Sequence, residues 1–167
     1  EGRDTTLEYG IKIAASLAHR CFQEGRAFRM WPRAREGAFS TRYGLLEHLA
    51  RLERSEEPSM HAMLSYRRPA DTWAVVVSAA DNEMLRMLQQ QWRGVERTTV
   101  VLLEGFGPGE DPAAGDRLSS MGAAVVRCRP GDLPAALVSL GRTMATGSAA
   151  KLASLQTGPP SSVAAEE

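Results

Sequence analysis

The sequence predicts an α/β fold in which a mostly parallel sheet lies between two layers of helices. Three short apolar runs carry this prediction, and each is followed closely by a helical pattern. They cover residues 72–79, 98–103 and 123–128. Strands and helices that alternate through short connections give right-handed crossovers, which place parallel strands side by side. We therefore expect a three-layer α/β sandwich.

The N-terminal segment predicts a helix over residues 5–24. Apolar side chains recur every three or four positions, and Thr5 with Glu8 has the spacing of a capping box. Gly25 is suited to end the helix. Because apolar residues occur on more than one face, we expect this helix to have two neighbours.

The next part of the chain predicts a short strand at residues 27–31, which Pro32 ends. A second helix follows, and Pro58 suits the first turn of a third. The apolar stripe of the second helix consists of Leu45, Leu46, Leu49 and Leu52.

The run at residues 72–79 is continuously apolar, as is typical of an interior parallel strand covered on both faces. We expect it to pair on one side with residues 99–103. Asp81 then caps a helix. A further helix is expected near residues 116–121, and Asp132 with Pro134 opens the last one.

Residues 1–144 are expected to form one domain. From Ala145 onward the composition shifts to Ala, Ser, Gly, Pro and Thr, with few large apolar groups to offset the entropy of ordering. The sequence therefore predicts a disordered, low-complexity tail over residues 145–167.

The composition, with 43% hydrophobic and 24% charged residues, is that of a soluble domain. Its 20 basic and 20 acidic side chains cancel, so no overall field favours nucleic acid or an anionic membrane. No apolar run approaches the roughly 20 residues that cross a bilayer. Cys21 and Cys128 lie among apolar residues, which favours buried free thiols in a reducing compartment.

Several segments resemble, in their order, the C-terminal domain of the bacterial family called domain of unknown function fifty-eight. They are residues 4–18, 43–53, 73–78 and 99–103, and the similarity extends over residues 4–142. The resemblance implies a von Willebrand factor A-like, Rossmann-like domain of a larger protein. That parent would be anchored by N-terminal membrane helices, with this domain in the cytoplasm. Genes of the family lie near those of MoxR-type AAA+ ATPases, which makes such an ATPase a candidate partner.

The chain begins at the first helix of that pattern, so we expect it to lack the first central strand of the A-domain. That strand would lie between the strands at residues 27–31 and 72–79. In metal-binding A-domains the loop after it carries an Asp-x-Ser-x-Ser motif, and two further loops supply oxygen ligands. Ser40 and Thr41 match one of these loops and Asp81 the other, although helix capping explains all three. Without the first loop we predict no metal ion.

Five arginines gather around the predicted first strand: Arg26, Arg29, Arg33, Arg35 and Arg42. They suit either a phosphate or acidic-partner patch or a solvated edge that discourages aggregation. His19, His48 and His61 have no metal-ligand spacing. The run from Gly105 to Gly109 lacks the lysine and hydroxyl residue of a phosphate-binding loop.

The leading hypothesis is a non-catalytic protein-binding module with no cofactor. It would present the loops around Ser40, Asp81 and Gly105, at the carboxyl ends of the strands, to a protein partner. The alternative is a small-molecule or nucleotide-binding α/β domain or enzyme that uses the same crevice. A third possibility is a purely structural fragment.

Overall fold

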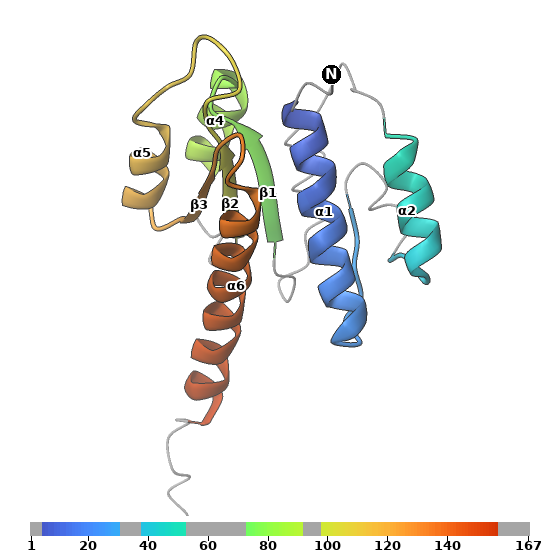
Figure 1. The fold of residues 1–167 in the computed structure, drawn as a ribbon. Helices are drawn as coiled ribbons and strands as arrows, with labels where there is room; N and C mark the ends of the chain where they lie inside the picture. The colour runs from blue at the N-terminus through green and yellow to red at the C-terminus, as the bar shows by residue number, and fades with distance from the viewer. Residues whose placement is uncertain (1–4, 31–37, 53–72, 92–97, 157–167) are drawn as a thin grey trace, which may run out of the picture.

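A computed structural model of the chain describes residues 5–30, 38–52, 73–91 and 98–156. Within these residues the sheet has three parallel strands in the order β1-β2-β3 (Figure 1). Their bounds are Trp73–Ser78 for β1, Thr98–Leu103 for β2 and Ala124–Cys128 for β3. Val75 lies opposite Val100, which in turn lies opposite Val125. The parallel sheet, and the pairing of the first apolar run with residues 99–103, are confirmed.

The period of two along each strand sends alternate side chains to opposite faces of the sheet, and each face has its own core. Val77, Val100 and Leu102 pack with helices α4 (Asn82–Gln91) and α5 (Ala114–Ser120). Val101 and Leu103 pack on the other face with α1 (Thr6–Gln23) and α6 (Leu133–Gln156). Helices therefore flank the sheet on both sides.

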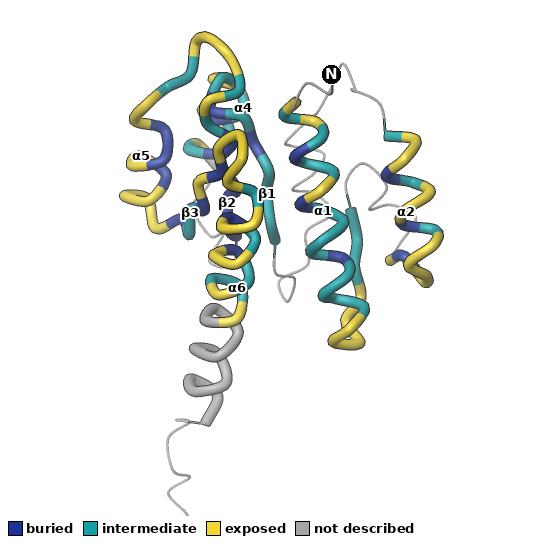
Figure 2. Tube along the Cα trace, viewed as in Figure 1, coloured by how far each residue is buried: buried dark blue, intermediate teal, exposed yellow. Residues whose placement is uncertain are grey.

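The position of β1 differs from the prediction within the described residues. Among the described strands β1 pairs with β2 alone, so it lies at the edge of the described sheet and β2 is the interior strand. All six residues of β2 are buried, whereas in β1 only Val77 is fully buried (Figure 2). The continuous apolar run correctly predicted that both faces of the strand are covered. It carries no information on how many strands lie beside it.

Helix α1 begins and ends as its sequence predicts. Thr5 Oγ1 accepts a hydrogen bond from the Glu8 backbone N–H at 3.2 Å. The Glu8 carboxylate instead pairs with Lys12 Nζ, at 2.7 Å. At the other end Gly25 has φ 65°, a left-handed conformation that favours glycine.

Two neighbours of α1 bury its two apolar faces, as expected. Tyr9 and Ile13 pack toward the sheet and α6. Ala18 packs on the other side with Leu45 and Leu49 of α2, which spans Arg42–Ala50. In Figure 1, α2 lies beyond α1.

The strand expected at residues 27–31 does not form in its described part, residues 27–30. Phe28 and Met30 instead pack against α1 and α2, and the Phe28 carbonyl accepts a hydrogen bond from the Phe39 N–H at 2.9 Å. The apolar residues are thus used for packing, without a neighbouring strand. Trp31, and the helix expected from Pro58, lie outside the described residues.

Helix α6 continues to Gln156, twelve residues past the domain boundary expected at residue 144. Ala and Leu are strong helix formers, and they are frequent in residues 145–156. This propensity accounts for the helical backbone up to Gln156. The disordered tail over residues 145–167 stays a prediction, and residues 157–167 lie outside the described part. A search of the described helices finds none long and apolar enough to span a membrane.

Candidate functional site

Asp81 and the loop from Gly105 meet at the carboxyl end of β1 and β2. Asp81 caps α4, since its Oδ1 accepts a hydrogen bond from the Met84 N–H at 3.0 Å. The loop crosses over the end of β1, where the Asp111 N–H donates to the Ala79 carbonyl at 3.1 Å. The structure therefore brings these two predicted positions to one end of the sheet.

The Gly105 loop is held by a carboxylate of its own. Glu110 accepts hydrogen bonds from the backbone N–H groups of Gly105, Phe106 and Gly107 at 2.6, 2.9 and 3.3 Å. Consecutive N–H groups that converge in this way form an anion-binding concavity, which is filled here from within the chain. Gly105 and Gly109 have φ values of 82° and 80°, so the turn needs glycine at both positions.

Charged side chains next to this loop form ion pairs that the sequence analysis did not single out. The Glu104 carboxylate lies 3.2 Å from Arg127 Nη1 and 3.3 Å from Arg129 Nη2. Arg127 also pairs with Asp116, and its guanidinium packs over the backbone of Gly115, where a Cβ atom would lie 2.7 Å from it. The signal in the sequence was the alternation of Arg127 and Arg129 around the buried Cys128.

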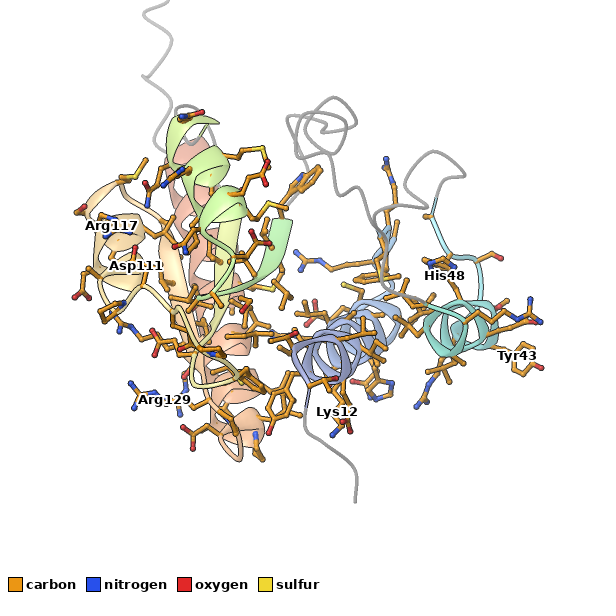
Figure 3. All side chains as sticks on the ribbon, turned by 90° about the horizontal axis from the view of Figure 1, so that it is seen from above. Lys12, Tyr43, His48, Asp111, Arg117 and Arg129 are labelled. Atoms are coloured by element: carbon orange, nitrogen blue, oxygen red, sulfur yellow. The ribbon has the colours of Figure 1, made fainter. Side chains whose placement is uncertain are left out.

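A further ion pair joins Asp111 to Arg117 of α5, and Figure 3 shows the two side chains next to each other. Asp111 Oδ1 also accepts a hydrogen bond from the Ala113 N–H at 3.0 Å. Both residues therefore fix the end of the loop at the start of α5. The described polar groups at this end of the sheet are largely satisfied by one another.

Ser40 and Thr41 do not join this end of the sheet. Thr41 caps α2 through a hydrogen bond from the Gly44 N–H to its Oγ1 at 3.1 Å, which is the role that capping predicts. Arg42, the next residue, shares a hollow with Ser16 and His19 in the second half of α1. The loop that starts at Gly105 is contacted instead by the first half of α1, where the Tyr9 ring packs on the Phe106 ring.

The structure describes three of the five candidate arginines, Arg26, Arg29 and Arg42. Arg26 Nη1 pairs with Glu24 Oε2 at 3.2 Å, and Arg42 lines the hollow between α1 and α2. Arg29 is half-buried. Arg33 and Arg35 lie outside the described residues, so the proposed patch can be followed only in part.

His19 and His48 belong to α1 and α2, and His61 lies outside the described residues. The His48 ring lies 5.5 Å from the Phe39 ring, and its Nε2 is buried without a hydrogen-bond partner among the described residues. Within the same part of the chain no group of three His, Cys, Asp or Glu side chains is placed to hold a metal ion.

Both cysteines are free thiols in the structure. Burial raises the pKa of the Cys128 thiol, and the nearby charge of Asp132 adds to this. Burial also raises the pKa of Cys21. A raised pKa lowers the thiolate fraction at neutral pH, so neither cysteine is set up as a nucleophile.

The free edge of β1 is the second candidate for a site. Val75 and Val76 on this strand are half-buried and pack on opposite faces of the sheet. The Trp73 indole Nε1, at the start of the strand, is buried and has no hydrogen-bond partner among the described residues. Indole N–H groups normally find an acceptor when they are buried.

Comparisons of the chain with models of protein families, with curated proteins and with solved structures gave no match.

Proposed function

We propose that the chain is a non-catalytic protein-binding module that receives an extended segment of a partner protein along the free edge of β1. One observation carries the proposal: among the described strands β1 pairs with β2 alone, so one side of β1 has no described strand next to it. Such an edge offers a row of backbone N–H and C=O groups to another chain. Strand addition is a recurrent mode of peptide recognition that uses these groups.

The side chains of β1 support the same proposal. Val75 and Val76 lie at the border of two cores, and an added strand would bury more of both. A backbone carbonyl of that strand would also give the buried Trp73 N–H an acceptor. Backbone hydrogen bonds would supply affinity, and contacts with alternate side chains would supply specificity.

The loops at the carboxyl ends of the strands are already occupied by contacts within the chain. In the described loops at the carboxyl ends of the strands, Glu110 occupies the converging N–H groups and Glu104 is held by two arginines. A substrate or nucleotide bound in that crevice would have to displace these contacts. This favours a binding module over the alternative of an enzyme or nucleotide-binding domain.

The resemblance to the family of domain of unknown function fifty-eight extends the proposal to the parent protein. In that reading the chain is a von Willebrand factor A-like domain without its first central strand, and the partner's extended segment would take the place of this strand beside β1. The parent would be membrane-anchored, with this domain in the cytoplasm and a MoxR-type AAA+ ATPase as a candidate partner. The strand order β1-β2-β3 is compatible with this arrangement.

Site-specific photo-crosslinking tests the proposal. A benzophenone amino acid at Ala74, on the half-buried edge strand, should crosslink a discrete protein through an extended segment that mass spectrometry identifies. The same group at Val138, an exposed position of α6, serves as the matched control and should not crosslink that protein. Val76→Lys, which places a charge on a β1 side chain that packs against one face of the sheet, should abolish the crosslink while the circular dichroism spectrum stays that of the folded chain. Equal products from both positions would refute strand addition at β1.

A further inference from the structure

Helices α1 and α2 enclose a hollow of about 250 Å³ on the side of the molecule away from β2. Its lining includes three apolar side chains and the guanidinium of Arg42. The lining residues are Ala15, Ser16, His19, Arg42, Leu45 and Leu46. The hollow therefore combines aliphatic surface with hydrogen-bond donors, as binding sites on proteins usually do.

The lining of the hollow includes the basic residue Arg42 and no acidic residue. The two glutamates of α1 and α2 are already paired, because Glu8 lies 2.7 Å from Lys12 and Glu47 lies 2.7 Å from Arg51. Arg42 is exposed and has no ion pair among the described residues. A ligand with a carboxylate would complement the rim, whereas a cationic ligand would be repelled.

The apolar surface of α2 extends beyond what α1 covers. Leu45 and Leu49 are buried against α1, but Leu46 stays 45% exposed at the mouth of the hollow. Tyr43 is 77% exposed, and Figure 3 shows it at the outer side of α2, pointing away from the rest of the molecule. A short helix with apolar groups on two sides has a second face to cover.

We propose that this hollow binds an acidic segment of a partner protein in which leucine-like side chains adjoin a carboxylate. The aliphatic side chain would rest on Ala15 and Leu46, and the carboxylate would accept hydrogen bonds from Arg42. Arg is suited to this role because its planar guanidinium can donate two parallel hydrogen bonds to one carboxylate. The inference goes beyond the proposed function, since it concerns a surface separate from the edge of β1.

The probe is the peptide Ac-Asp-Leu-Leu-Asp-NH2, added to the complete ¹⁵N-labelled chain. We expect saturable chemical-shift changes at the amides of Ser16, His19 and Leu46. The isosteric peptide Ac-Asn-Leu-Leu-Asn-NH2 keeps the apolar groups without the charge and should bind about tenfold more weakly, as expected for loss of a charge-assisted hydrogen bond. Arg42→Gln should weaken binding of the acidic peptide about five- to tenfold.

Arg51→Gln is the matched control, because Arg51 is the C-cap residue of the same helix, is exposed and does not line the hollow. It should change the affinity less than about twofold, in line with the small effects of exposed ion pairs. Val76→Lys should also leave this affinity unchanged, which separates the inference from the proposal on β1. Equal binding of the two peptides, an unchanged affinity in Arg42→Gln, or no saturable shift at millimolar peptide would overturn it.

Discussion

The phenolic oxygen of Tyr9 accepts a hydrogen bond of 2.7 Å from the backbone N–H of Gly131. This bond joins α1 to the loop between β3 and α6, across 122 residues of sequence. Tyr9 is only 3% exposed, and its ring packs edge-to-face on Phe106 with a centroid distance of 4.7 Å. One side chain therefore ties the N-terminal helix to two loops at the carboxyl ends of the strands.

We predict that Tyr9→Phe destabilises the protein by about 1–3 kcal/mol, because it leaves the Gly131 N–H without its acceptor while the ring packing is kept. Urea unfolding measures the change. Tyr43→Phe is the control, since Tyr43 is 77% exposed, and it should shift the free energy by no more than about 0.5 kcal/mol. Equal effects of the two substitutions would show that the Tyr9 bond does not contribute.

Glu110 should govern the order of the Gly105 loop. Glu110→Ala removes the acceptor of three backbone N–H groups, so amide exchange at Gly105, Phe106 and Gly107 should become faster. Because water can replace the carboxylate in this exposed loop, we expect a loss of stability of only about 1 kcal/mol. Glu83→Ala, at an exposed glutamate of α4, should leave exchange in the loop unchanged.

The stabilisation that the Arg20–Glu24 pair gives the end of α1 should depend on pH. The hydrogen bond from Arg20 holds the pKa of Glu24 below its usual range, and Arg26 contributes less. Since the folded pKa is lowered, the stabilisation by this pair is present above the unfolded pKa and is lost as pH falls through the folded pKa. In NMR titrations, Arg20→Gln should raise the pKa of Glu24 toward its usual range, and Arg26→Gln should raise it less. The reverse order would contradict the assignment.

The three strands and most helices could be predicted because their signals are local. The runs at residues 72–79 and 98–103 are apolar enough to require cover on both faces, and Thr5, Thr41 and Asp81 each cap the helix that follows. The edge position of β1 could not be predicted in this way. It depends on which other segment lies alongside, and the apolar pattern is the same at an edge and in the interior.

The candidate site was less predictable for a related reason. Asp81 and Gly105 follow adjacent strands, so topology alone brought them to one end of the sheet. Thr41 shares with Asp81 a place before a helix, but α2 packs on α1, Phe28 and Met30, and its first residues lie beside the second half of α1. Ion pairs such as Glu104 with Arg129 join residues 25 positions apart, and no local pattern marks them.

Divalent cations should leave the thermal midpoint of the chain unchanged within error. Asp81 Oδ1 is already engaged by the Met84 N–H, and no group of three metal-ligating side chains occurs in the described residues. A cation that bound the folded state would stabilise it by about 2.7 kcal/mol at a hundredfold excess over its dissociation constant. Thermal scans with magnesium and manganese test this. A saturable rise in the thermal midpoint that is absent in Asp81→Ala would show that a metal ion binds at Asp81.

The last prediction concerns the edge of β1, on which the proposed function depends. In a parallel sheet each interior strand bonds to neighbours on both sides, and successive residues direct their N–H groups alternately to one side and the other. The amides of β2 should therefore all be protected from hydrogen exchange, because β2 lies between β1 and β3. In β1 about half of the amides, those directed away from β2, should exchange quickly, while the others stay protected. The alternation itself is the control, since both sets belong to one strand. Uniform protection along residues 73–78 would mean that another segment already covers the edge, and it would remove the observation that supports strand addition.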